Sequence, residues 1–149
     1  MMASFSFNGI DSITASFAEL AEIDDDTREN LLRAGGEAVE RHQKEYLQQH
    51  HSRTGELAES IRYKRKGEFG IVAPTGKHSG VGTGRRKSKR GKSHGSYSGT
   101  NAEVAYILEF GSPRLPATHW MEKANEEAEP DFESAMAAAW NEHLNKLGL

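Results

Sequence analysis

The sequence predicts an α+β protein in which a small antiparallel sheet packs against two long helices, with a long flexible basic loop. Three patterns predict this class. Residues 24–51 and 115–148 repeat apolar side chains at helical spacing, and residues 60–73 read as two short strands joined by a glycine turn. The chain has 149 residues, of which 36% are apolar, which is enough for one domain with a modest core. We therefore expect a single domain over 1–149, with 76–99 as an inserted loop.

The N-terminal residues predict a short strand and a short helix. Phe5 and Phe7 alternate with serines before the turn signal at residues 8–9. Apolar residues over 13–20 then recur at helical spacing. The segment lacks the basic and apolar regions of a secretory signal, and no apolar run is long enough to cross a bilayer. We therefore expect the chain to stay in the cytoplasm where it is made and to have no membrane partner.

Residues 24–51 predict the first long helix. Acidic residues 24–26 lie at its positive end, and Asp26 and Glu29 have the spacing of a capping box. Its inner stripe is expected to consist of Leu31, Leu32, Gly35, Ala38, Val39, His42 and Tyr46. Each glycine of the pair at 35–36 costs about 1 kcal/mol in a helix interior. Another helix or a neighbouring subunit should therefore approach the helix at this pair.

Residues 60–66 and 69–73 predict an antiparallel hairpin with its turn at Gly67. Ile61 and Tyr63 alternate with charged residues, as in a half-buried strand. Later in the chain, residues 102–111 predict part strand and part helical turn.

The second long helical pattern spans 115–148. Pro130 is expected to mark a kink or a restart at a first-turn position. Beyond this proline the helical spacing continues through Phe132, Met136, Ala139, Trp140, His143 and Leu147.

Charge is distributed unevenly along the chain. Residues 76–99 contain seven Lys/Arg and no Asp/Glu, which leaves 12 basic against 22 acidic residues, a net charge of −10, elsewhere. The same 24 residues include seven glycines and five serines, so the segment cannot bury enough apolar surface to order itself. As an extended hairpin it could reach roughly 40 Å.

No catalytic residue, cofactor or metal site is predicted. The chain has no cysteine, which excludes disulfides and thiolate metal sites. Residues 70–78 resemble a phosphate-binding loop, but the glycine spacing is one residue too long and His78 replaces the magnesium-binding hydroxyl. The histidines at 42 and 50–51 favour a core imidazole and helix-end cations over metal ligation, and residues 24–26 lack the pattern of a calcium loop.

Two stretches, 52–61 and 105–124, carry a family pattern. Its residues are Thr54, Gly55, Leu57, Ser60, Ile61, Tyr106, Glu109, Phe110, Gly111, Ser112, Arg114 and Pro116. In order and spacing they resemble the tail-completion, or head-to-tail joining, proteins of long-tailed lambda-like bacteriophages, also called the phage morphogenesis or minor tail family. The resemblance covers nearly the whole chain outside 77–99. His119 and Trp120 depart from it, since such proteins usually have Pro and Phe before the final helix.

The resemblance implies a structural virion protein rather than an enzyme. Such proteins form a ring, usually hexameric, at the head-proximal end of the tail. The ring would meet a head-closure or neck protein and the tail terminator or tail-tube protein. The implied location is the head–tail interface of the virion, and no cofactor is implied.

The signature residues also have physical roles. Thr54 can cap the turn that follows it, and Gly55 permits a tight start, which puts Leu57 and Ile61 on one buried side.

In the second stretch, Tyr106 and Phe110 lie one helical turn apart and are expected to anchor this segment in the core. Glu109 is close in sequence to Arg114. The two either brace a turn or contact a neighbouring subunit, and an exposed pair would contribute about 0–1 kcal/mol.

The basic loop has two interpretations. It becomes ordered on assembly, against an acidic partner surface or the genome in the lumen, or it is a solvated loop without defined contacts. Its contacting residues would be Lys77, Arg85, Arg86, Lys87, Lys89, Arg90 and Lys92. The alternative function is a small nucleic-acid-binding protein that uses 76–99. Only Tyr97 is an aromatic residue near these cations, and no recognition helix or stacking platform is evident.

Overall fold

The computed structural model describes residues 23–51, 54–78, 86–87, 93–94 and 99–149. The elements in chain order are α2 (Asp25–His50), α3 (Glu56–Ser60), β1 (Ile61–Lys66), β2 (Phe69–Pro74), β3 (Arg86–Lys87), β4 (Ser93–His94), α4 (Asn101–Phe110) and α5 (Trp120–Lys146). The strand and helix predicted for the first 22 residues lie outside the described residues. The predicted α+β class, with a small antiparallel sheet and two long helices, is confirmed.

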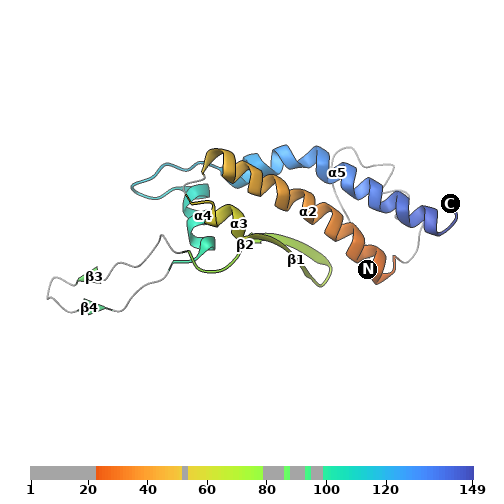
Figure 1. The fold of residues 1–149 in the computed structure, drawn as a ribbon, viewed down its shortest axis with the longest axis horizontal. Coiled ribbons are helices and arrows are strands. Elements are labelled where there is room, and N and C mark those ends of the chain that lie inside the picture. Colours follow the sequence, from red (N-terminus) through yellow and green to blue (C-terminus); the bar gives the residue numbers. More distant parts are fainter. Residues whose placement is uncertain (1–22, 52–53, 79–85, 88–92, 95–98) are drawn as a thin grey trace.

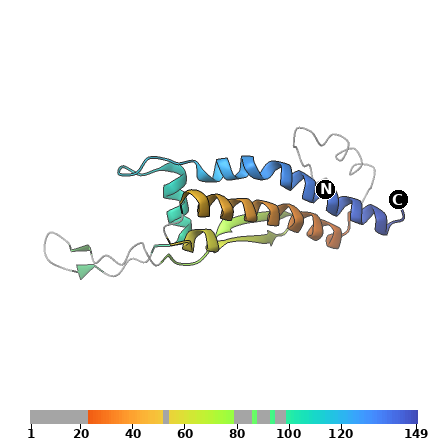
Figure 2. The ribbon, with the colours of Figure 1, turned by 45° about the horizontal axis from the view of Figure 1, so that its top comes forward.

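Helix α2 forms the middle layer of the molecule. The β1–β2 hairpin packs on one side of it and α5 on another, as Figures 1 and 2 show. The short helices α3 and α4 pack together beside the hairpin, close to where α5 begins. Among the helices of the described segments, none is both long and apolar enough to span a membrane.

The N-terminus of α2 is capped by Asp24, whose Oδ1 accepts a hydrogen bond from the Thr27 main-chain N–H at 2.6 Å. The capping box predicted from the spacing of residues 26 and 29 does not form, because the N-cap residue is Asp24. Four predicted stripe residues, Leu31, Gly35, Ala38 and Tyr46, are buried. Thr27, Gln43 and Leu47 are also buried, because α2 is covered by more than one layer and its buried surface is wider than a single stripe.

Close approach at the glycine pair of α2 is confirmed. A Cβ atom on Gly35 would lie 2.5 Å from Phe132 Cε2 of α5, and a Cβ on Gly36 would collide with the Tyr63 ring of β1. Both neighbouring layers therefore contact α2 within one helical turn. The missing side chains allow this packing, which explains the two unfavourable residues.

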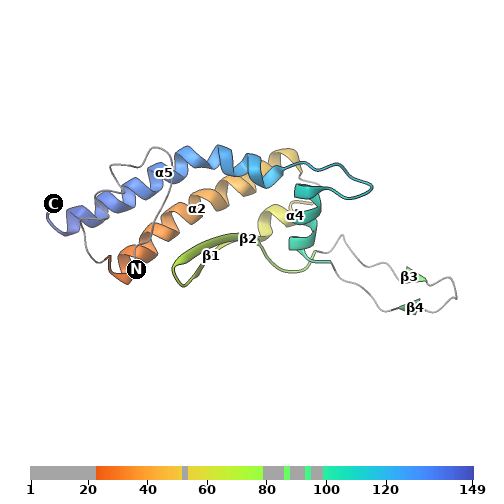
Figure 3. The same ribbon diagram turned by 180° about the vertical axis from the view of Figure 1, so that it is seen from behind.

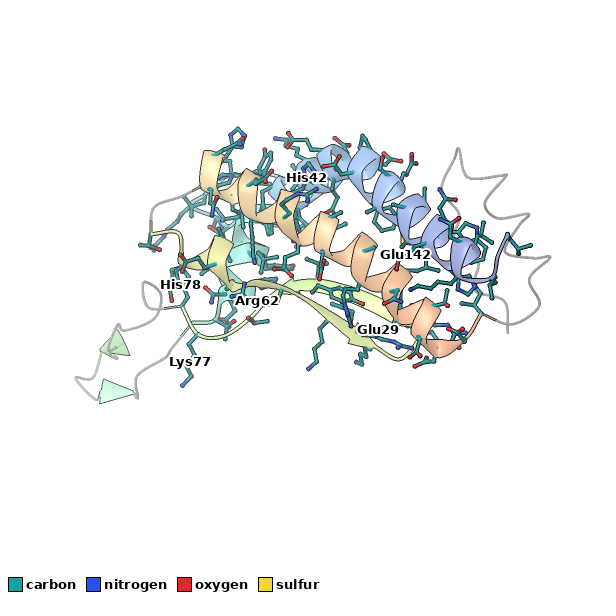
Figure 4. All side chains as sticks on the ribbon, turned by 45° about the vertical axis from the view of Figure 1, so that its right-hand side comes forward. Glu29, His42, Arg62, Lys77, His78 and Glu142 are labelled. Carbon is teal, nitrogen blue, oxygen red and sulfur yellow. The ribbon has the colours of Figure 1, made fainter. Side chains whose placement is uncertain are left out.

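The predicted hairpin is confirmed. Its strands pair antiparallel from Ile61 opposite Pro74 to Lys66 opposite Phe69. The inner row of β1 faces α2, and Arg65 at its end binds α2 through Nη1 to Glu29 Oε2 at 2.9 Å and Nη2 to Asp25 Oδ1 at 2.5 Å. Figure 4 shows the Glu29 side chain between α2 and the hairpin.

Helix α4 corrects the prediction of part strand and part turn for residues 102–111. The segment is helical from Asn101 to Phe110 because Thr100 and Glu103 form a complete capping box. Glu103 N donates to Thr100 Oγ1 at 3.2 Å, and Thr100 N donates to Glu103 Oε2 at 2.9 Å. These reciprocal bonds satisfy two of the free N–H groups at the helix start.

Helix α5 begins at Trp120, five residues after the predicted start, and continues without interruption through Pro130. Of the two outcomes predicted for this proline, the restart is therefore wrong, and the kink stays a prediction. Trp120 is fully buried, and its Nε1 donates to the Ala105 carbonyl of α4 at 3.0 Å. The residue that departs from the family pattern is therefore at the centre of the core, which groups Tyr46, Leu47, Leu57, Ala58, Ile61, Ala105, Trp120 and Ala124.

Candidate functional site

The second group of signature residues lies at the corner where α4 leads into α5. Glu109, in the last turn of α4, accepts a hydrogen bond through Oε2 from the Met121 main-chain N–H at 2.7 Å. His119 precedes α5 but makes no side-chain cap, so the Glu109 carboxylate caps this helix instead. No ion pair joins Glu109 to Arg114 within the described residues. Glu109 therefore joins the end of α4 to the start of α5 within the chain.

The corner turns at Gly111, whose φ is +79°. A Cβ atom there would lie 2.7 Å from Ala117 N and 2.9 Å from Leu115 O, so only glycine fits. The following turn is closed by hydrogen bonds in both directions between Ser112 and Leu115, at 2.8 and 3.1 Å. This turn holds Arg114 exposed at the surface.

Tyr106 and Phe110 correct the expectation that they anchor the core. They are 63% and 62% exposed, and their ring centroids lie 4.8 Å apart on the outer side of α4. The helical spacing correctly placed the two rings together. However, the buried apolar side chain of α4 is that of Ala105, whose carbonyl accepts a hydrogen bond from Trp120 Nε1. We define Tyr106, Phe110 and the exposed Leu115 as the corner patch.

The first group of signature residues is structural. Gly55 has a φ of +73° and starts α3, and Leu57 and Ile61 are buried in the core as predicted. Thr54 Oγ1 accepts from the Glu56 N–H at 3.4 Å, a long hydrogen bond. Leu57 and Ile61 are therefore inaccessible to a partner in the folded chain.

The basic segment is described only in part. At its base, Lys77 and Thr100 form an isolated antiparallel β-bridge, and the His78 N–H donates to Gly99 O at 3.0 Å. Buried Asn101 holds both sides of this base through N to Gly76 O at 3.1 Å and Nδ2 to Thr75 O at 2.7 Å. Figure 4 shows the Lys77 side chain extending away from the body.

Farther out, β3 and β4 pair antiparallel, with Arg86 opposite His94 and Lys87 opposite Ser93. Of the other predicted contact residues, Arg85, Lys89, Arg90 and Lys92 lie outside the described residues. Figure 3 shows β3 and β4 at the same end of the molecule as the loop of residues 111–119. The flexibility predicted for 76–99 stays a prediction.

A cationic surface that was not predicted as a site lies on the outer face of the hairpin. Arg62, Lys64 and Lys66 of β1 are all exposed, and so are Phe69 and Ile71 of β2. The alternation of charged and apolar residues in β1 carried the signal. The same alternation predicts a half-buried strand and also places three cations in one row.

One side-chain group at the corner could hold a metal ion. Glu109, His119 and Glu122 each offer a ligand atom, and these atoms lie within 4.8 Å of one another. His119 Nδ1 and Glu122 Oε2 are 3.7 Å apart. Nitrogen and carboxylate ligands of this kind suit divalent transition ions. The Glu109 carboxylate already caps α5, and the other two residues are exposed.

Ion pairs that join the elements shift the pKa values of the carboxyl groups in them. The hydrogen bond from Arg65 lowers the pKa of Asp25 below its ordinary value. The pKa of Asp131 on α5 is lowered first by its hydrogen bond with His42 and then by Arg41, both on α2. Figure 4 shows His42 on the α5 side of α2. These carboxylates therefore stabilise the packing of the layers when they are ionised.

Comparison of the chain with models of protein families, with curated proteins and with solved structures finds no match. The resemblance to tail-completion proteins therefore rests on the signature residues alone.

Proposed function

We propose that the chain is a structural virion protein that forms a ring at the head-proximal end of a phage tail and joins the tail to the neck of the head. The observation that carries this proposal is the corner patch. Tyr106 and Phe110 form an exposed aromatic pair, and Leu115 is exposed on the adjoining loop. Aromatic side chains of this kind are enriched where proteins bind each other.

The corner patch has a rigid support. The Thr118 N–H and hydroxyl both donate to Leu108 O, at 2.8 and 2.6 Å, which ties the connecting loop to the end of α4. The Glu109 cap then fixes the start of α5 to the same turn. A surface that is held in place before binding loses little conformational freedom on association, which favours assembly. This supports a role in protein contact, with copies of the chain and with neck, terminator or tube proteins.

The proposal is tested by removing the aromatic pair. Tyr106→Ser together with Phe110→Ser should leave the far-UV circular dichroism unchanged but abolish ring formation, measured by sedimentation velocity over a concentration series. The matched control is Leu147→Ser with Leu149→Ser, which also removes two exposed apolar side chains, after the last turn of α5. Rings that persist in the corner variant, or a wild-type chain that stays monomeric at every concentration, would refute the proposal.

The second candidate is a small nucleic-acid-binding protein. It is favoured by the cationic residues along one strand, Arg62, Lys64 and Lys66, together with exposed Phe69, which offers a ring for base stacking. In that case the isolated monomer would bind DNA at submicromolar concentration with a steep dependence on salt, because each neutralised phosphate releases counterions. Weak DNA binding together with ring formation would favour the tail protein.

A further inference from the structure

The outer face of the hairpin is both cationic and apolar. The β1 row and its cross-strand partners consist of Arg62 opposite Ala73, Lys64 opposite Ile71 and Lys66 opposite Phe69. Directly opposed residues of an antiparallel pair point to the same side of the sheet. These six residues therefore share one face, which carries three positive charges and no negative charge.

This outer face is uncovered in the described chain. Phe69 is 71% exposed and Ile71 is 43% exposed. Neither Lys64 nor Lys66 has an ion-pair partner among the described residues. The hairpin is held to the body through its inner row, where Tyr63 packs on Gly36 and Arg65 binds Asp25, and through the Tyr63 main-chain N–H, which donates to Glu40 Oε2 at 2.6 Å. Two large apolar side chains beside unpaired cations are suited to bind an acidic surface with some apolar character.

A row of opposite charge lies on α5. Glu122, Glu126, Glu129 and Glu133 follow one another at i, i+4, i+7 and i+11, which places them on one side of the helix. The first three are exposed and Glu133 is half-buried. Glu126, Glu129 and Glu133 have no ion-pair partner in the part of the chain that the structure describes. We call these four residues the acidic row.

The spacings of the two rows are similar. Alternate residues of a strand are about 6.6 Å apart. Residues three and four apart on a helix are separated by about 4.5 and 6 Å along its axis. Long lysine and glutamate side chains can take up the remaining difference. A helix laid along β1 could therefore place successive carboxylates beside successive cations.

The two rows cannot meet within one chain. The hairpin and α5 occupy separate layers with α2 between them (Figure 2). We propose that the outer hairpin face of one copy docks on the acidic row of α5 of the next copy. Because the two surfaces differ, the contact is heterologous, and its repetition closes into a ring when the rotation per step divides a full turn. This inference rests on the proposed ring function and names a second contact between neighbouring copies, in addition to the corner patch.

Charge and apolar area have different roles in this contact. Exposed ion pairs contribute little affinity individually, but they select the partner and the register. Burial of Phe69 and Ile71 would supply the main driving force. DNA is the other polyanion that could occupy the face, but it would meet a chain of net charge −3. A second copy is favoured because the complementary row, at similar spacing, is present on the same chain.

The test is a charge swap in the full chain. Lys64→Glu with Lys66→Glu, and separately Glu126→Lys with Glu129→Lys, should each weaken self-association by at least about tenfold in sedimentation experiments. An equimolar mixture of the two variants should associate more strongly than either alone, because the hairpin face of each variant is opposite in charge to the α5 row of the other. The control for the second variant, Glu45→Lys with Glu59→Lys, makes the same charge change at exposed residues of α2 and α3 and should assemble like the wild type.

A disulfide crosslink tests which residues meet in the contact. Because the chain has no cysteine, Lys64→Cys and Glu126→Cys introduce single thiols. Oxidation of a mixture of these variants, carrying different tags, should give the mixed disulfide as the main product. A wild type that assembles while the charge variants assemble equally well would overturn this inference and leave the ring intact. A wild type that never assembles would overturn both proposals. Loss of DNA binding in the lysine variant, without loss of assembly, would show that the face binds nucleic acid instead.

Discussion

The contact between Gly36 of α2 and Tyr63 of β1 predicts that a substitution normally favourable in a helix will destabilise this protein. A Cβ atom on Gly36 would lie 2.5 Å from Tyr63 Cε2 and 2.9 Å from Cγ, and closer still to Cδ2. The ring also lies close to Gly70 of β2, where an added Cβ atom would be 2.8 Å from Tyr63 Cε2. The ring therefore has little room to move away from α2. The tyrosine ring therefore lies close to two glycines from different elements.

The expected magnitude follows from two opposing effects. Gly36→Ala gains about 1 kcal/mol of helix propensity. Overpacking typically costs about 1–3 kcal/mol, and three ring atoms within 3.0 Å place this site at the upper end. We therefore expect a net loss of about 2 kcal/mol in the free energy of unfolding.

Urea unfolding followed by circular dichroism measures this loss. The informative control is the same substitution in a Tyr63→Ala background, where the collision is absent and only the propensity gain remains. There Gly36→Ala should stabilise the chain by about 1 kcal/mol, so the sign of the effect reverses. A stabilising Gly36→Ala in the wild type, or the same effect in both backgrounds, would refute the reasoning.

Two further predictions concern the corner and the acid stability. Glu109→Ala removes the acceptor for Met121 N and should cost about 1 kcal/mol in thermal unfolding, whereas Glu109→Gln keeps an acceptor oxygen and should retain most of the stability; equal losses would exclude a capping role. Arg65 lowers the pKa of Asp25 from its ordinary 3.8, so the ion pair stabilises the fold at neutral pH. This contribution disappears as the pH falls below 3.8 through the lowered pKa of the folded state and the carboxylate becomes protonated. Arg65→Met should therefore lose stability near pH 7 but approach the wild type near about pH 2 in urea titrations, and a gap of constant size would contradict the assignment.

Much of the fold was predictable because its main elements carry strong local patterns. Helix α2 has a long run of helical periodicity, and the hairpin has alternation around a glycine turn. The glycine pair at 35–36 correctly indicated a close approach, since only packing accounts for two such residues in mid-helix.

The errors came from short or ambiguous segments. Residues 102–111 form a brief apolar run, for which periodicity alone does not separate strand from helix. The deciding signal was the capping box at Thr100 and Glu103, which was present in the sequence. Whether Tyr106 and Phe110 face the core depended on Trp120, which is distant in sequence and takes the buried position against Ala105. Such a choice is made by tertiary packing, so spacing alone could not supply it.

Because the base of the basic segment is closed by hydrogen bonds, the stability of the folded body does not depend strongly on the length of that segment. The hydrogen bonds of Asn101 to Thr75 and Gly76, and of His78 to Gly99, complete the closure before the cationic stretch begins. Because the entropic cost of a longer loop rises only slowly with its length, residues could be inserted or deleted beyond His78 with little thermodynamic penalty. Evolution could thus lengthen or shorten this appendage to suit a different companion while it retains the same scaffold.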